Sequence, residues 1–98
     1  MKVVFDTKDR TKILDDIKEA MGGRSLAEIV DFSMTSNQLV VTISKMGTSK
    51  LEFSESETDS GYTYTLTKEK IALTHKAFKD EVTKKILSVV EKAGGKIS

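Results

Sequence analysis

The chain has 98 residues, of which 38% are hydrophobic and 32% charged, too apolar a composition for a disordered chain. It contains no cysteine, so disulfides, thiolate metal ligands and cysteine nucleophiles are excluded together. No apolar run exceeds three residues, and no charged segment followed by an apolar core opens the chain. We therefore expect neither a transmembrane span nor an export signal, and a cytoplasmic protein with a single domain over residues 1–98.

Charge is distributed unevenly, although the formal net charge is only +1. Residues 1–67 carry 8 basic and 11 acidic side chains, a balance of −3. Residues 68–98 carry 8 lysines and 4 acids, a balance of +4. Such asymmetry can mark a contact with nucleic acid or a membrane surface, but it also arises by chance at these counts. Charge alone therefore selects no partner.

The N-terminal part of the chain predicts a strand followed by a helix. The first five residues include β-branched and aromatic side chains, which favours a short strand. As an exposed edge, residues 2–5 could pair across a homodimer axis. Asp6 and Thr7 offer side-chain oxygens that could cap the next helix. From residue 9 to residue 21 the apolar side chains recur on one helical face, and Gly22-Gly23 is expected to end the helix.

Between residues 28 and 67 the apolar period changes from 3.6 to 2, which predicts strands. Residues 25–28 resemble a capping box, but no helical period follows, so we predict a turn into the strand that follows. The chain then alternates in four segments whose apolar members are Val30, Phe32, Met34, Leu39, Val41, Ile43, Leu51, Phe53, Tyr62, Tyr64 and Leu66. Their short connections predict an antiparallel meander that is covered on one face only.

The C-terminal part of the chain predicts a second helix over residues 74–93, ended by Gly94-Gly95. The order β-α-β-β-β-β-α then predicts an α+β fold, with two helices packed on one face of an antiparallel sheet of four to five strands. The expected core residues are Phe5, Ile17, Met21, Phe32, Met34, Ile43, Phe53, Leu66, Phe78 and Ile86.

The residues that could carry chemistry are few. His75 is the only histidine, and its place near the start of the last helix, facing the sheet, favours a capping or packing role over catalysis. One histidine without cysteine cannot hold a structural zinc, so no metal, cofactor or catalytic residue is predicted. The acidic stretch 55–61 lacks the spacing of an EF-hand loop, so we interpret it as a solvated hairpin.

Nucleic acid is not the expected partner. Tyr62 and Tyr64 share one sheet face, but the neighbouring Glu52 and Glu57 would repel phosphate. We expect these tyrosines at the margin of the core, with their hydroxyls reaching solvent. The lysines of the last helix are scattered and include no arginine, which makes a weak phosphate grip.

The chain resembles a known family along most of its length. Residues 37–43 and 47–53 look like paired strands of the small polyhydroxyalkanoic acid system proteins, and residues 71–79 with the following helix are similar to that family's last third. Two features depart from the family pattern, since lysines replace an arginine-rich C-terminal helix and the hairpin 56–61 is longer. The resemblance implies a non-catalytic protein associated with polyester storage granules, with no active site to carry over.

Two hypotheses about function follow. The first is a small non-enzymatic protein that binds a protein partner or an apolar surface such as a polyhydroxyalkanoate granule, with Lys76, Lys79 and Lys85 contacting the partner. The alternative is a helix-grip-like domain that holds a small apolar ligand between the sheet and the last helix. In that case His75 and Tyr64 are its expected polar contacts.

Overall fold

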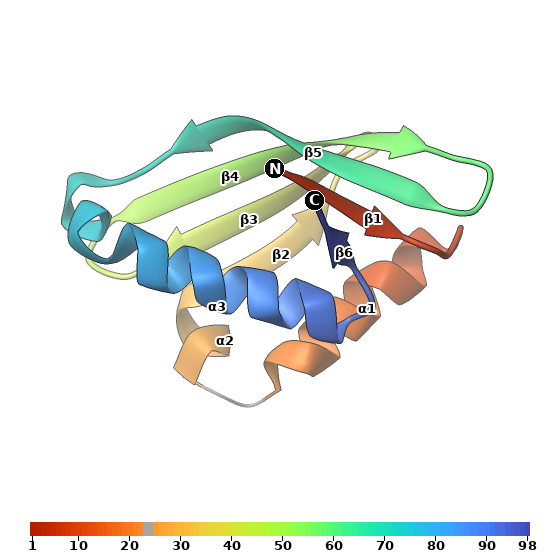
Figure 1. Cartoon of the computed structure of the whole chain (residues 1–98). Coiled ribbons are helices and arrows are strands. Elements are labelled where there is room, and N and C mark those ends of the chain that lie inside the picture. Colours follow the sequence, from red (N-terminus) through yellow and green to blue (C-terminus); the bar gives the residue numbers. More distant parts are fainter. Residues whose placement is uncertain (23–24) are drawn as a thin grey trace.

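The computed structural model describes residues 1–22 and 25–98, except for the side chains of residues 25, 26 and 78. Its elements in chain order are β1 (Lys2–Phe5), α1 (Arg10–Met21), α2 (Ser25–Ile29), β2 (Val30–Met34), β3 (Gln38–Ser44), β4 (Thr48–Glu57), β5 (Tyr62–Lys70), the 3₁₀ helix η1 (Leu73–Phe78), α3 (Lys79–Lys92) and β6 (Lys96–Ile97). Helices α1 and α3 lie beneath the same face of the sheet (Figure 1). The predicted α+β fold is therefore confirmed.

The strands of the described residues form one antiparallel sheet in the order β2-β3-β4-β5-β1-β6. Strands β2 to β5 are the predicted meander. Val3 of β1 lies opposite Tyr64 of β5 on one side and opposite Ile97 of β6 on the other. The prediction that residues 2–5 form an exposed edge was therefore wrong, because the chain returns after α3 and covers that edge with β6.

Helix α1 begins at Arg10 and is capped by the residue before it. The side chain of Asp9 accepts a hydrogen bond from the Lys12 N–H at 3.1 Å, which satisfies one of the free amides of the first turn. The prediction of Asp6 and Thr7 as caps was wrong, because the helix begins too late for either side chain to reach its first turn. The Thr7 hydroxyl instead accepts a hydrogen bond from the Asp9 N–H at 3.3 Å.

The connection from α1 to β2 contains a short helix. Gly22 ends α1 with φ of 62°, a conformation that glycine adopts without steric cost; Gly23, the second residue of the predicted stop, lies outside the described residues. Residues 25–29 then form α2, so the predicted turn directly into a strand was wrong. Five residues are too few to display a helical period in the sequence.

The predicted C-terminal helix has two parts. Its first turns form η1, and the regular α-helix α3 runs from Lys79 to Lys92. The predicted apolar stripe of this helix comprises residues 78, 82, 86, 89 and 93. Its members Ile86 and Val89 are buried, and so is Val90, which the stripe did not include. The side chain of Phe78, another member of that stripe, lies outside the described residues.

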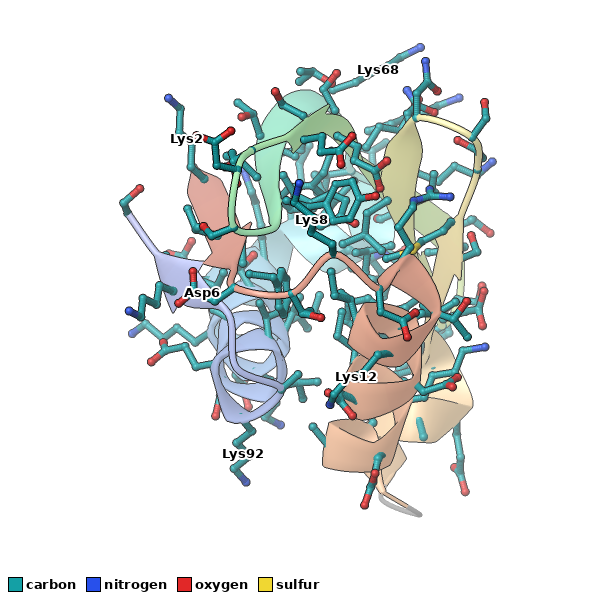
Figure 2. The ribbon with its side chains drawn as sticks, turned by 90° about the vertical axis from the view of Figure 1, so that its right-hand side faces the viewer. Lys2, Asp6, Lys8, Lys12, Lys68 and Lys92 are labelled. Carbon is teal, nitrogen blue, oxygen red and sulfur yellow. The ribbon has the colours of Figure 1, made fainter. Side chains whose placement is uncertain are left out.

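The core fills the space between the sheet and the helices. Met34 and Leu66, both predicted core residues, are only partly buried at its margin. The buried residues among those predicted are Phe5, Ile17, Met21, Phe32, Ile43, Phe53 and Ile86. The other face of the sheet is open, and Figure 2 shows Lys2 and Lys68 projecting from it, whereas Lys92 projects from the helical layer.

Candidate functional site

His75 lies in η1 and is buried, where it contacts the end of the β3–β4 hairpin. Its Nε2 is 2.6 Å from the carbonyl oxygen of Lys45, and its Nδ1 is 2.5 Å from the hydroxyl of Ser49. A carbonyl oxygen can only accept, so Nε2 carries the proton and Nδ1 accepts from the Ser49 hydroxyl. The Ser49 oxygen in turn accepts from the Ala72 N–H at 2.8 Å. We call these four groups the Ser49–His75 network.

A second contact reinforces this junction between the hairpin and η1. The Thr74 hydroxyl donates to the Met46 carbonyl at 2.7 Å. At Gly47, where φ is 140°, a Cβ would lie 2.8 Å from the Thr74 oxygen and 3.3 Å from the Ala72 side chain. Glycine therefore permits the close approach of the two segments. The predicted packing role of His75 agrees with this placement, in which both ring nitrogens make hydrogen bonds.

Two hollows lie between the sheet and α3, and His75 lines both of them. The inner one has a volume of about 20 Å³, which is room for one water molecule. The outer one is an open groove of about 230 Å³. Both are lined by Ile43, His75 and Val82, so they are neighbours. The hypothesis of an apolar ligand held between the sheet and the last helix requires a cavity there. The structure has space at that place, but most of it belongs to the open outer groove and not to the small inner hollow.

Tyr64 lies in a different polar cluster from His75. It is fully buried, and its hydroxyl donates to Glu55 at 2.8 Å. Arg10 donates to the same carboxylate oxygen at 2.7 Å and also to the Thr35 carbonyl. The expectation that the Tyr64 hydroxyl reaches solvent was wrong, because the residue is buried and its hydroxyl is bonded to the carboxylate that Arg10 also contacts. The structure therefore does not bring Tyr64 and His75 to one site.

The charge state of this second cluster is fixed by burial and by its ion pair. Burial, and then the hydrogen bond to Glu55, raise the pKa of Tyr64 above its ordinary value. The hydrogen bond to Glu55 likewise raises the pKa of Arg10. The Glu55 side chain is only 9% exposed, so its interpretation as part of a solvated hairpin was wrong. It lies within β4, and the turn itself begins only after Glu57.

The three lysines predicted to contact a partner differ in their surroundings. Lys79 pairs with Glu69 at 2.5 Å, and hydrogen bonding to that carboxylate raises its pKa. Lys85 lies 3.5 Å from Glu81, one turn earlier on the same helix. Lys76 is exposed in η1, and no ion pair within the described part of the chain involves it.

Sequence reasoning missed an exposed apolar pair beside Lys76. Met46 is 85% exposed and Leu73 is 82% exposed, on the two segments that the hydrogen bond of Thr74 holds together. Both segments lie at the end of the molecule where β5 runs into η1, on the left in Figure 1. Residues 45–50 and 70–76 also hold four lysines and no acid. We call these two segments the basic tip.

The lysines of the basic tip are placed closer together than the sequence suggests. Lys50 of β4 lies directly opposite Lys70 of β5, a like-charge pair that destabilises a sheet. Lys45 and Lys76 stand on the adjoining turn and on η1, and all four lysines are exposed. None of the ion pairs among the described residues involves any of them. The tip therefore carries uncompensated positive charge.

Comparison with known proteins gives no match: no family model, no curated protein and no solved structure matches the chain. None of the helices in the described residues is long and apolar enough to cross a membrane. Nor do the described residues contain a group of three or more histidines and carboxylates that could hold a metal ion. Function must therefore be argued from the two clusters, the hollows and the basic tip.

Proposed function

We propose that this chain is a small non-enzymatic protein that attaches through its basic tip to an apolar surface carrying negative charge, such as the lipid-coated surface of a storage granule. The observation that carries the proposal is the exposed pair Met46 and Leu73 among four lysines that form no ion pair within the described residues. Single exposed apolar side chains are ordinary on a protein surface. Two of them on adjoining segments, surrounded by lysines, instead indicate a surface that contacts something both apolar and negatively charged. The cytoplasm, where such granules form, is the compartment we expect.

The energies of the two kinds of contact are comparable. Burying the side chain of a methionine or leucine contributes about 1.5–3 kcal/mol, and a lysine near an anionic lipid surface contributes about 1 kcal/mol. Two apolar side chains and four lysines are therefore sufficient for reversible attachment. The junction with η1 also fixes the hairpin before binding, which lowers the entropy cost of ordering it.

The surroundings of Ser49 support the non-enzymatic part of the proposal. A serine next to a histidine can be a nucleophile, but this hydroxyl is buried, donates to His75 and accepts from the Ala72 N–H. Ser49 lies within β4, whose backbone amides form the ladder with β3 and are not gathered into an oxyanion hole. The network therefore satisfies polar groups of the fold rather than presenting them to a substrate.

Co-sedimentation with lipid vesicles tests the proposal. The protein should sediment with vesicles that contain phosphatidylglycerol, sediment less with phosphatidylcholine alone, and be released by salt. The double variant Met46→Ser/Leu73→Ser should lose most of the binding. Lys2→Gln/Lys92→Gln, which removes two lysines away from the tip, is the matched control and should bind as the parent does.

Lipid-free polyester particles serve as a second surface in the same assay. Retention on these particles that depends on Met46 and Leu73 extends the proposal to the polymer itself. Equal binding by the parent and the Met46→Ser/Leu73→Ser variant, or no binding to either surface, would overturn it.

A further inference from the structure

The open groove beside α3 combines an apolar floor with charged rims. Ile29 at the end of α2, Ile43 at the end of β3 and Val82 of α3 form the apolar part of its lining. Lys45, Glu81 and Lys85 form the charged part of the lining. Its volume of about 230 Å³ suits a small molecule rather than a peptide or a nucleic acid.

We propose that this groove binds a monocarboxylate with an alkyl chain of medium length. The chain would lie on Ile43 and Val82, and the carboxylate would lie between the ammonium groups of Lys45 and Lys85. This inference goes beyond attachment through the basic tip and does not depend on it.

The charges at the groove favour an anion. Lys45 has no ion-pair partner among the described residues, whereas Lys85 is paired with Glu81 at 3.5 Å. That pair is solvent-exposed on both sides, and exposed pairs contribute little free energy, so a ligand carboxylate can compete for the lysine. The lysines and carboxylates of the lining are Lys45, Lys85 and Glu81, which together carry one net positive charge.

The apolar part of the ligand follows from the shape of the two hollows. The inner hollow, at about 20 Å³, has no room for more than the tip of a chain, so the ligand must lie in the outer groove. His75 borders both hollows, but its ring nitrogens already bond Ser49 and the Lys45 carbonyl. Its ring nitrogens are therefore already occupied, which leaves the lysines to recognise the carboxylate.

Titration of the isotope-labelled protein with octanoate, followed by amide chemical shifts, tests the proposal. Saturable shifts should gather at Ile29, Ile43, Lys45 and residues 81–85. Octanol, which lacks the carboxylate, and acetate, which lacks the chain, should each bind more weakly. If octanol binds as tightly as octanoate, or if octanoate causes no saturable shift, the proposal is wrong.

Substitutions on the exposed rim keep the test independent of folding. Lys85→Gln should weaken octanoate binding by about two- to fivefold, as expected for one exposed charge contact. Glu81→Gln, which frees Lys85, should strengthen binding, and Lys92→Gln should leave it unchanged. An affinity unaffected by Lys85→Gln would refute the assignment. Met46→Ser/Leu73→Ser should lose most of the vesicle binding without a change in octanoate binding, so the two proposals can fail separately.

Discussion

Replacing Ser49 with alanine should destabilise the fold, because one hydroxyl makes two hydrogen bonds there. The oxygen accepts from the Ala72 N–H at 2.8 Å and lies 2.5 Å from Nδ1 of His75. Alanine is close to serine in volume, so the substitution removes hydrogen bonds without opening a large cavity. The change in the free energy of unfolding therefore reports on the Ser49–His75 network itself.

The expected loss is about 2–6 kcal/mol, because losing a hydrogen bond to a buried group costs about 1–3 kcal/mol and two such bonds are lost. For a domain of this size each kcal/mol lowers Tm by about 4–8 °C, so Tm should fall by at least about 8 °C. The slope of the urea transition should stay constant, since the same surface is exposed on unfolding.

Urea unfolding followed by circular dichroism measures this loss. Ser54→Ala is the matched control, because Ser54 lies on the same strand with its side chain on the exposed face. This control should change the free energy of unfolding by less than about 0.5 kcal/mol. If Ser49→Ala unfolds at the same urea concentration as Ser54→Ala, the network does not stabilise the junction and the reasoning is refuted.

Three further predictions concern the rest of the structure. The pKa of Tyr64 is raised in the folded state, so just above the ordinary value of 10.0 this tyrosine ionises only in the unfolded state. Its contribution to the free energy of unfolding should therefore be fully present below pH 10.0 and should fall by about 1.4 kcal/mol per pH unit above it. In the Tyr62→Phe background, tyrosinate absorbance should therefore rise together with the loss of circular dichroism. Glu55→Gln should shift the rise in tyrosinate absorbance to lower pH. It should also lower the free energy of unfolding, measured in urea, by about 1–2 kcal/mol, because the ion pair with Arg10 is lost. An absorbance titration that stays at the same pH would contradict the hydrogen bond from Tyr64 to Glu55. Gly47→Ala should lower the free energy of unfolding by about 1–3 kcal/mol, and urea unfolding equal to the parent's would show that φ of 140° is not required there.

The sequence predicted the elements whose length displays a period. Alternation predicts a meander between residues 28 and 67, which the structure has at residues 30–70, and helical spacing predicts the buried faces of α1 and α3. Helix α2 and strand β6 have five and two residues, too few for either pattern. Strand β6 depends on a tertiary contact, since Gly95 passes so close to Val3 and Val90 that a Cβ would lie 2.8 Å from each. Only the folded chain reveals that requirement.

The positions of the buried polar residues between the sheet and the helices can be predicted in part from the sequence. Leu51 and Phe53 face the core, and continuing their alternation by one step in each direction places Ser49 and Glu55 on the same face. That signal identifies two inward polar side chains. It does not reveal their partners, because His75 is 26 residues from Ser49 and Arg10 is 45 residues from Glu55.

The backbone at Met46 gives a physical argument for the basic tip. Its φ is 52°, a left-handed conformation that costs a side chain with a Cβ about 1–2 kcal/mol and that glycine or asparagine adopts more readily. The hairpin holds this conformation through the bond from the Lys45 N–H to the Gly47 carbonyl, at 3.0 Å, and through the bond from Thr74. With 85% of its surface exposed, the methionine side chain gains little from the core to offset the strain. The folded chain therefore gains little stability from a methionine at residue 46. Contact with an apolar surface would give this side chain a favourable environment, as the attachment proposal requires.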